Sequence, residues 1–385
     1  MRLYRSVPHQ RRGKRPSDRR TESHRNGVST MSASALLLPQ GHPTLRPAGM
    51  GFGRACVNLL LGILAIVWLA ACDDPKPVQK GTAMVEGAAK SEPAAVPAPK
   101  RRQIALVMKT LTNPFFVEME RGARKAETEL GIELLVKTAA QETSIEQQVA
   151  IVEELVRQKV DAIVIAPGDS VKLIPALKRA QDAGLAVVNI DNRLDGDFSR
   201  TLGLRTVPFI SVDNEQGAFL VASALTSGVT EPSKAAVIEG IRSASNAESR
   251  KAGALRAFSG NPAVTVVAQE SANWKIDEAY DVAKGLFTRE PGITLLFCAN
   301  DMMALGAARY IQEAGLSNVR IAGFDALADA VEAVKQGTLT ATVDQQAGRQ
   351  GYLGVVYANR MISGETMPPE TIVDVRILTT QPAKP

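Results

Sequence analysis

Amide, carboxylate and aromatic side chains recur where short apolar runs of the sequence end, and these groups suit the binding of a hydroxylated molecule. Charged groups bond to hydroxyls with about 1.5–3 kcal/mol per hydrogen bond, and aromatic faces pack on the C–H surfaces of a ring. Aromatic residues make up only 4% of the chain, so their presence in this set is informative. The candidate ligand-binding residues are Asn113, Phe115, Phe116, Asp191, Asn192, Asn246, Arg250, Trp274, Asn300, Asp325 and Gln345.

Few residues of the sequence suit catalysis or a metal site. The three histidines are His9, His24 and His42, so a chain that loses its first 71 residues has none to ligate a metal or act as a general base. Cys298 stands in an apolar run, which is typical of a small core residue rather than a nucleophile. No phosphate-cradling glycine motif follows the first expected strand. We therefore expect a binding protein without cofactor or metal, and not an enzyme.

From residue 103 onward, short aliphatic or β-branched runs alternate with amphipathic stretches of helical period. The expected strands are 104–107, 133–136, 162–166, 186–190, 235–239, 264–268, 295–299 and 320–324. The expected helices are 114–130, 145–158, 172–183, 216–225, 247–258, 276–288, 302–314 and 326–335. Gly131, Gly184 and Gly315 stand just before new strands, where a left-handed backbone after a helix is easiest for glycine. This alternation indicates parallel sheets with helices on both faces.

The alternation runs through several units and restarts near Asp213. Two similar lobes explain this restart more simply than one very large sheet. The expected fold class is therefore α/β, with two doubly wound, Rossmann-like lobes. In such sheets the ligand lies beyond the carboxyl ends of the strands, which is where the candidate residues occur.

Positive charge is concentrated near the start of the chain. The formal net charge is +5, but residues 1–71 hold 11 of the 45 Lys and Arg and only two of the 40 Asp and Glu. The rest of the chain has 34 basic and 38 acidic residues, so its body is mildly acidic. This distribution does not favour a nucleic-acid partner.

Residues 57–71 form the most apolar run, which has the length of a signal-peptide core and falls short of the roughly 20 residues of a membrane span. The run LAAC that ends at Cys72 resembles the lipobox of bacterial lipoproteins, in which the cysteine is lipidated. We therefore expect a leader and lipoprotein signal peptide over 1–71, with Met50 as the suspected start. A lipidated Cys72 and a Pro- and Ala-rich tether are expected over 72–102.

Four further motifs carry a resemblance to a known family. They are Thr112-Asn113-Pro114-Phe115-Phe116, Asn300-Asp301 within CANDMMALG, Gly323-Phe324-Asp325, and ATVDQ ending at Gln345. With these motifs, residues 103–378 resemble the periplasmic ribose-, allose- and galactose-type sugar-binding proteins of ABC importers. That family has the type I periplasmic binding protein fold, which it shares with the ligand domains of lactose-repressor-like regulators.

The resemblance implies roles for the candidate residues. Asn113 and the paired phenylalanines would hold a sugar from one lobe, and Trp274 would cover its other face. Asn246 occupies a position where galactose-type members place a polar ligand residue. The residues implied to bond the hydroxyls are Asp191, Arg250, Asn300, Asp325 and Gln345.

Two positions depart from the ribose-type pattern. Ala166 stands where an Asn contacts the sugar, and Asn192 stands where an Arg follows the Asp. Each change removes or shortens a donor, and an unpartnered buried hydroxyl costs about 1–3 kcal/mol. We therefore expect that ribose is not the tightest ligand. Arg193, one place later, is open as a replacement.

Several candidate residues also have a plain structural interpretation. Phe115 and Phe116 open a helix and are also suited to the core, and Trp274 is suited to core or ligand platform. Asp301 is expected to cap the following helix. Asp325 is suited either to an N-cap before Ala326 or to ligand contact, which the family motif favours.

The resulting hypothesis is an exported, monomeric lipoprotein, anchored to the membrane on its periplasmic or cell-surface face. It captures a sugar or polyol between two closing lobes and delivers it to the permease of an ABC importer. The expected lobes are 103–211 plus 346–374 and 212–345 plus 375–385, joined by a three-segment hinge. The alternative is a sugar-sensing lipoprotein that signals to a chemoreceptor or histidine kinase. A repressor-type regulator is disfavoured because residues 73–102 offer no helix-turn-helix.

Overall fold

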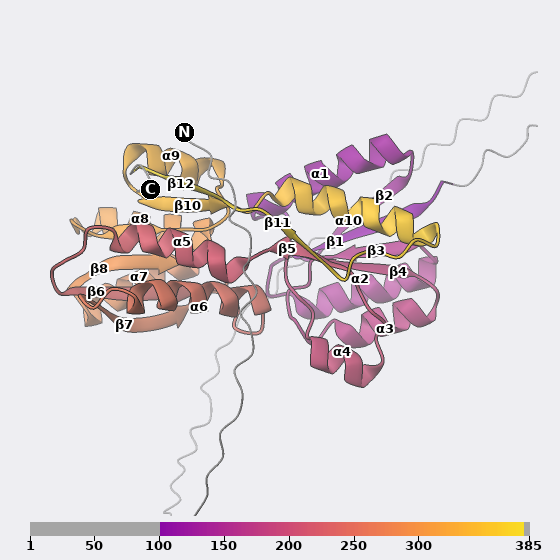
Figure 1. The fold of residues 1–385 in the computed structure, drawn as a ribbon, viewed down its shortest axis with the longest axis horizontal. Coiled ribbons are helices and arrows are strands. Elements are labelled where there is room, and N and C mark those ends of the chain that lie inside the picture. The colour runs from indigo at the N-terminus through magenta and orange to yellow at the C-terminus, as the bar shows by residue number, and fades with distance from the viewer. Residues whose placement is uncertain (1–100, 381–385) are drawn as a thin grey trace, which may run out of the picture. The chain divides into compact units, whose positions relative to one another are not determined.

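The computed structural model describes residues 101–380. The expected leader, Cys72 and most of the tether, together with residues 381–385, lie outside the described residues. Within the described part, the chain forms two six-stranded sheets with helices on their faces (Figure 1). No helix among residues 101–380 is long and apolar enough to cross a membrane.

The first sheet has the strand order β11-β5-β4-β3-β1-β2, and its paired strands are parallel. Its strands are β1 (Gln103–Met108), β2 (Glu133–Thr138), β3 (Ala162–Ile165), β4 (Ala186–Ile190), β5 (Phe209–Val212) and β11 (Glu370–Val373). The helices that pack on it or follow its strands are α1 (Pro114–Leu130), α2 (Ile145–Gln158), α3 (Ile174–Asp182), α4 (Gly196–Leu202) and α10 (Ala347–Ile362). We call these elements the first lobe.

The second sheet has the order β12-β10-β9-β8-β6-β7. Its strands are β6 (Ser233–Glu239), β7 (Val264–Ser271), β8 (Ile293–Cys298), β9 (Arg320–Ala322), β10 (Ala341–Asp344) and β12 (Arg376–Thr379). The associated helices are α5 (Asn214–Thr226), α6 (Ser245–Ser259), α7 (Ile276–Arg289), α8 (Asp301–Glu313) and α9 (Ala328–Gln336). We call these elements the second lobe. Strand β12 pairs antiparallel with β10, so the expectation of purely parallel sheets is wrong for this edge strand.

Both sheets repeat one topology. Strand β1 lies between β2 and β3, and β6 lies between β7 and β8. The direction of winding reverses at these strands, so the loops that follow β1 and β6 diverge from their neighbours and leave room for a ligand. The predicted fold class of two doubly wound lobes is confirmed, and the loops after β1 and β6 become the first places to search for a site.

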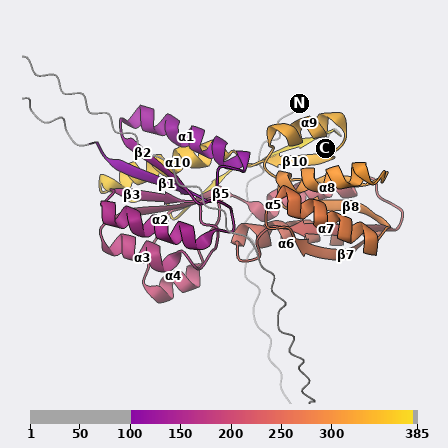
Figure 2. The same ribbon diagram turned by 180° about the vertical axis from the view of Figure 1, so that it is seen from behind.

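The helices form layers on each sheet, and close approaches need glycine. In the first lobe α1 packs beside α10 and α2 beside α3, while in the second α5 packs beside α6 and α7 beside α8 (Figures 1 and 2). A Cβ at Gly351 of α10 would lie 2.1 Å from the Met119 carbonyl oxygen of α1. These two helices therefore approach more closely than any side chain at that position allows.

Several short or atypical elements were missing from the expected set, namely α4, α10, β5, β10, β11 and β12. Helix α10 buries residues at helical spacing, and several of them, such as Gly351, Gly354 and Ala358, are small, which permits tight packing. Helix α9 starts at Ala328 rather than at residue 326, because Asp325 and Ala326 have φ angles of 130° and 53°. Such angles are outside the helical region.

Candidate functional site

Asn113 sets the start of α1 and holds two aromatic rings in place. Its side-chain oxygen accepts from the Phe115 backbone N–H at 3.0 Å, which is an N-cap contact. Its Nδ2 donates to Glu142 Oε1 at 2.9 Å. Phe115 and Phe116 are both buried and meet edge to face, with centroids 5.0 Å apart. The polar and apolar members of this predicted group therefore lie together at the carboxyl end of β1.

A buried ion pair lies beside these rings. Lys109 Nζ is 2.8 Å from Asp191 Oδ2, and both side chains are at most 3% exposed. The ammonium lies 5.6 Å from the Phe116 ring centroid and 5.9 Å from that of Trp274, within the range of cation–π attraction. Asp191 has a φ of 63°, an uncommon angle for a residue with a side chain. The ammonium of Lys109, which follows β1, thus lies near both predicted aromatic residues.

Trp274 belongs to the second lobe and is held by the end of β6. Its ring is 4% exposed and packs on Gly240, where a Cβ would lie 2.2 Å from the indole. Its backbone carbonyl accepts from Asn300 Nδ2 at 3.2 Å. Its φ of 69° is also unusual. The indole Nε1 is buried and has no hydrogen-bond partner among the described residues.

Arg250, on α6, is the centre of the polar groups in the second lobe. Its Nε donates to Asn214 Oδ1 at 2.8 Å, and Nη1 donates to the Ala299 carbonyl at 2.9 Å. Nη1 also lies 3.5 Å from Asp325 Oδ1, and Nη2 donates to Gln345 Oε1 at 3.2 Å. Burial lowers the pKa of Arg250, although the Asp325 carboxylate opposes that shift. A guanidinium keeps its charge here because its donors are satisfied by four different residues.

Asp325 and Gln345 complete this arrangement. Gln345 Nε2 donates to Asp325 Oδ1 at 2.5 Å, and both side chains are buried. Burial raises the pKa of Asp325 well above its ordinary value, and Arg250 acts in the opposite direction. The guanidinium carbon of Arg250 also lies 3.8 Å from the Phe324 ring centroid. Arg250, Asp325 and Gln345 therefore form one network, in which Asp325 Oδ1 and Gln345 Oε1 each accept a hydrogen bond.

Asn246 and Asn192 link the two lobes. Asn246 Nδ2 donates to Asp191 Oδ1 at 3.3 Å, and its backbone N–H donates to Asn192 Oδ1 at 3.2 Å. Asn192 Nδ2 donates to the Pro167 carbonyl at 3.1 Å and contacts Ser170 Oγ at 3.3 Å. The Asn192 amide is thus engaged with protein groups, whereas Asn246 Oδ1 is buried without a partner among residues 101–380.

Arg193, which was open as a replacement donor, points elsewhere. It forms an ion pair with Glu370 of β11, and its guanidinium lies 4.0 Å from the Phe209 ring centroid. Its side chain is 45% exposed. Arg193 therefore does not reach Asp191 in this structure.

Asn300, and not Asp301, is the N-cap residue of α8. Asn300 Oδ1 accepts from the Met303 backbone N–H at 2.9 Å and so caps α8. Asp301 is the first helical residue, and its carboxylate instead accepts from Leu327 N and Thr342 Oγ1. The expectation that Asp301 caps α8 is wrong, because the extended backbone of Asn300 places the amide oxygen over the first turn.

Two charged residues of this cluster, Lys109 and Glu142, were absent from the predicted set. Both are buried, and both follow first-lobe strands, β1 and β2. Burial raises the pKa of Glu142, while Lys109 and the Asn113 amide oppose that shift. A search for every charged residue just beyond a strand would have found Lys109. Glu142 lies several residues beyond β2, and its placement depends on Asn113, which no local pattern announces.

The assembled cluster suits binding by hydrogen bonds and ring stacking. Cationic, anionic and amide groups from both lobes surround Phe116 and Trp274, and they pair with one another. Within residues 101–380, no group of three or more His, Cys, Asp or Glu side chains is placed to hold a metal ion. In this cluster, Trp274 Nε1 and Asn246 Oδ1 are buried without a hydrogen-bond partner among residues 101–380. Each can therefore form a hydrogen bond with a ligand.

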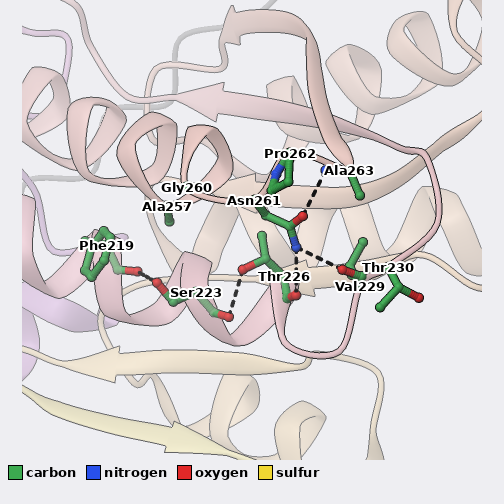
Figure 3. A pocket seen from close by; sticks show the side chains of 10 residues that line it. All are labelled: Phe219, Ser223, Thr226, Val229, Thr230, Ala257, Gly260, Asn261, Pro262 and Ala263. Atoms are coloured by element: carbon green, nitrogen blue, oxygen red, sulfur yellow. Dashed lines mark hydrogen bonds between the residues drawn. The ribbon is translucent and has the colours of Figure 1, made fainter.

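A separate surface pocket on the second lobe has a different character. It is lined by α5, the loop between α5 and β6, the end of α6 and the loop between α6 and β7. Its lining residues include Phe219, Thr226 and Asn261 (Figure 3). The Asn261 amide already donates to the Thr226 and Val229 carbonyls. None of the predicted site residues lines it. Its polar atoms serve the turn between α5 and β6.

Comparisons with known proteins agree with this geometry. A periplasmic binding protein domain matches residues 104–366. The chain is 37% identical over 271 residues to the D-ribose/D-allose-binding protein of Pseudomonas aeruginosa, which covers 70% of this chain and 84% of that protein. It is 32% identical over 289 residues to the D-allose-binding periplasmic protein of Escherichia coli, with 72% and 92% covered. A solved ABC transporter periplasmic solute-binding protein from Actinobacillus succinogenes 130z with bound D-allose is 38% identical, with a TM-score of 0.69 and 72% and 98% covered.

Proposed function

Because the chain belongs to the periplasmic binding protein family, we propose that it binds a monosaccharide or polyol and delivers it to an ABC importer. The relatives with named ligands are sugar-binding transport proteins rather than enzymes. The protein acts in the periplasm, where such receptors meet their permease. Sugar binding is thus its function, and the permease is its partner.

One observation carries this proposal: the buried Trp274 Nε1 and Asn246 Oδ1 lack partners beside an otherwise paired ring of charges. A sugar hydroxyl can both donate and accept, so one ring can satisfy both atoms. The faces of Phe116 and Trp274 supply packing for its C–H groups. A polyhydroxylated neutral molecule matches this combination better than an anion, because Asp191, Asp325 and Glu142 oppose added negative charge.

In this proposal the lobes comprise 103–211 with 346–374, and 212–345 with 375–385. The sheet membership of β11 and β12 supports this division, because β11 joins the first sheet and β12 the second. The chain then crosses between the lobes near residue 212, near Gln345 and near Val375. Ligand contacts from both lobes stabilise the closed arrangement relative to the open one.

The hydrogen-bond donors that the first lobe offers bear on which sugar binds best. Ala166 supplies no side-chain donor, and the Asn192 amide is engaged with protein groups. Lys109 brings three N–H donors to the same region, which compensates for that loss. Because relatives are named for D-allose, we propose D-allose as a better ligand than D-ribose, and we keep the prediction that ribose is not the tightest ligand.

The test is a thermal-shift screen of the purified protein against pentoses, hexoses, polyols and inositols, followed by calorimetric titration. A sugar at about 100 times its Kd should stabilise the fold by roughly 2.7 kcal/mol. The Arg250→Met variant should lose this response, and Arg256→Met, an exposed arginine on the same helix, should keep it. A wild-type protein that responds to no sugar or polyol would contradict the proposal.

Anchoring is a further part of the proposal and rests on the sequence alone. The run that ends at Cys72 supports lipidation there, followed by a Pro- and Ala-rich tether of about 30 residues. Cys72→Ala should release the protein from the membrane fraction and abolish labelling with an alkyne fatty acid, while sugar affinity stays unchanged. Equal labelling of wild type and variant would exclude this anchor.

A further inference from the structure

Asp301 is a buried carboxylate that lies behind the candidate site. It is the first residue of α8 and is fully buried. Its Oδ2 accepts from the Leu327 backbone N–H at 2.9 Å, and its Oδ1 accepts from the Thr342 hydroxyl at 2.7 Å. Both bonds lead away from α8 toward the segment that carries Asp325. The carboxylate therefore serves a neighbouring loop rather than its own helix.

Thr342, on β10, extends this contact to a second backbone group. Its hydroxyl accepts from the Ala326 backbone N–H at 3.2 Å while it donates to Asp301. The Asp301 backbone N–H in turn donates to the Phe324 carbonyl at 2.8 Å. Backbone groups on both sides of Asp325 are thus held by the same two residues.

The segment held in this way has a costly backbone conformation. Asp325 has a φ of 130° and Ala326 a φ of 53°, and neither is glycine. Such residues persist only where the surroundings over-determine them, and they cluster at binding sites. A Cβ at Gly323 would lie 2.1 Å from Asp301 Oδ1, so the strand end approaches the carboxylate as closely as glycine permits. The close contact at Gly323 and the positive φ angles of Asp325 and Ala326 therefore occur in the same turn, residues 323–327.

We propose that Asp301 and Thr342 are positioning residues that fix residues 324–327 so that the Asp325 carboxylate meets both Arg250 and the bound sugar. The inference rests on the proposed function for its ligand. Asp325 Oδ1 already lies 2.5 Å from Gln345 Nε2 and 3.5 Å from Arg250 Nη1. A shift of the turn by a fraction of an ångström would lose these bonds.

The charge of Asp301 gives this role a pH signature. The titratable groups that face it are Arg250 on α6, Asp325 in the turn and Cys298 on β8. Burial raises the pKa of Asp301 to about 6. Below that pH one oxygen carries a proton and loses an acceptor function, so the turn loosens and sugar affinity falls.

Stability responds to the same proton with the opposite sign. The folded pKa lies above the ordinary value of 3.8, so the folded state binds the proton more tightly than the unfolded state. This contribution to stability is present below pH 3.8 and is lost as the pH rises through about 6. If Asp301 only supported the fold, its protonation would not lower sugar affinity while it raised stability.

The test compares threonine variants by calorimetric titration of D-allose and D-ribose at pH 7.5. Thr342→Val removes the hydroxyl at nearly constant volume and should weaken affinity at least about tenfold, the range of one lost bond to a charged group. Thr342→Ser keeps the hydroxyl and should retain most of the affinity. Thr294→Val is the matched control, because the buried Thr294 hydroxyl on β8 has no hydrogen-bond partner among the described residues. It should leave affinity unchanged.

A second measurement follows affinity from pH 7.5 to 5.0 in wild type and in Asp301→Asn. The wild-type fall near pH 6 should be smaller in the variant, which keeps only the titration of Asp325. The proposal is overturned if Thr342→Val binds like Thr294→Val, or if Asp301→Asn keeps the same pH profile. If wild type binds neither sugar, D-allose and D-ribose are not its ligands, and crystal structures of wild type and Thr342→Val test instead whether Thr342 positions the turn. If residues 324–327 have the same conformation in the two crystal structures, the positioning role of Thr342 is overturned.

Discussion

Replacing Arg250 with Met tests whether the centre of the second lobe is held by a buried charge. The side chain is 3% exposed and bonds to Asn214, Ala299, Asp325 and Gln345. Removal leaves the Ala299 carbonyl and two side-chain oxygens without these donors and leaves the Asp325 carboxylate without its cation. Removing one partner of a buried pair costs about 3–5 kcal/mol. We expect a loss of this size in the free energy of unfolding at pH 8.

The loss should depend on pH because Asp325 can take up a proton when its cation is removed. Burial already raises the pKa of this carboxyl in the presence of Arg250, and loss of the guanidinium raises it further. A raised folded pKa contributes stability at low pH that disappears as the pH rises. The destabilisation by Arg250→Met should therefore be smaller at pH 5 than at pH 8. Adding Asp325→Asn should remove most of this pH dependence.

Urea unfolding of the wild type and variants measures these differences. Arg256→Met is the control, since Arg256 lies on the same helix, is 47% exposed and pairs with Glu215. An exposed pair contributes about 0–1 kcal/mol, so its loss should be small. Equal destabilisation by the two variants, or a pH-independent loss at Arg250, would refute the assignment of a buried charge network.

Two further substitutions probe the atoms of the site. Trp274→Phe removes the partnerless Nε1 and keeps a smaller aromatic face, so sugar affinity should fall about fivefold or more by calorimetry. Stability should also fall, because the smaller ring leaves a cavity beside Gly240. Unchanged affinity would return the indole N–H to a packing role. Glu142→Gln keeps an acceptor for Asn113 and removes a carboxyl whose pKa burial raises, so the variant's stability relative to wild type should increase from pH 4 to pH 8. A relative stability that decreases over this range in urea unfolding would contradict the burial argument.

Much of the architecture was predictable because buried parallel strands and amphipathic helices leave distinct periods in a sequence. The runs around Ile104 and Val164 are fully buried in the sheet, and Gly131 has the expected left-handed angle of 65° after α1. The candidate residues were also expected to cluster because they follow strand ends. In the structure, this cluster includes Asn113, Asp191, Arg250 and Trp274. Within each sheet this clustering follows from the topology, whereas the approach of the two sheets does not.

The remaining features depend on contacts between distant segments. Helix α10 lies more than 200 residues after α1 in the sequence, and the close approach that Gly351 permits between them is visible only in the fold. Lys109 finds its partner Asp191 some 80 residues later, and no spacing rule links them. The Asn192 side chain turns toward Pro167 and Asn246, a direction that the identity of the residue does not reveal.

The distribution of charges suggests why lobe closure can respond to a neutral ligand. Lys109 pairs with Asp191 inside the first lobe, and Arg250 pairs with Asp325 inside the second, so separation of the lobes breaks neither pair. Among residues 101–380, the lobes are linked by hydrogen bonds, such as Asn246 to Asp191 and Ser170 to Ser243, and by the approach of the Lys109 ammonium to the Trp274 ring. Each such bond contributes about 0.5–1.5 kcal/mol. In the proposed function, a few such bonds would leave the open and closed states close in free energy, so the additional bonds of one sugar would suffice to shift the population.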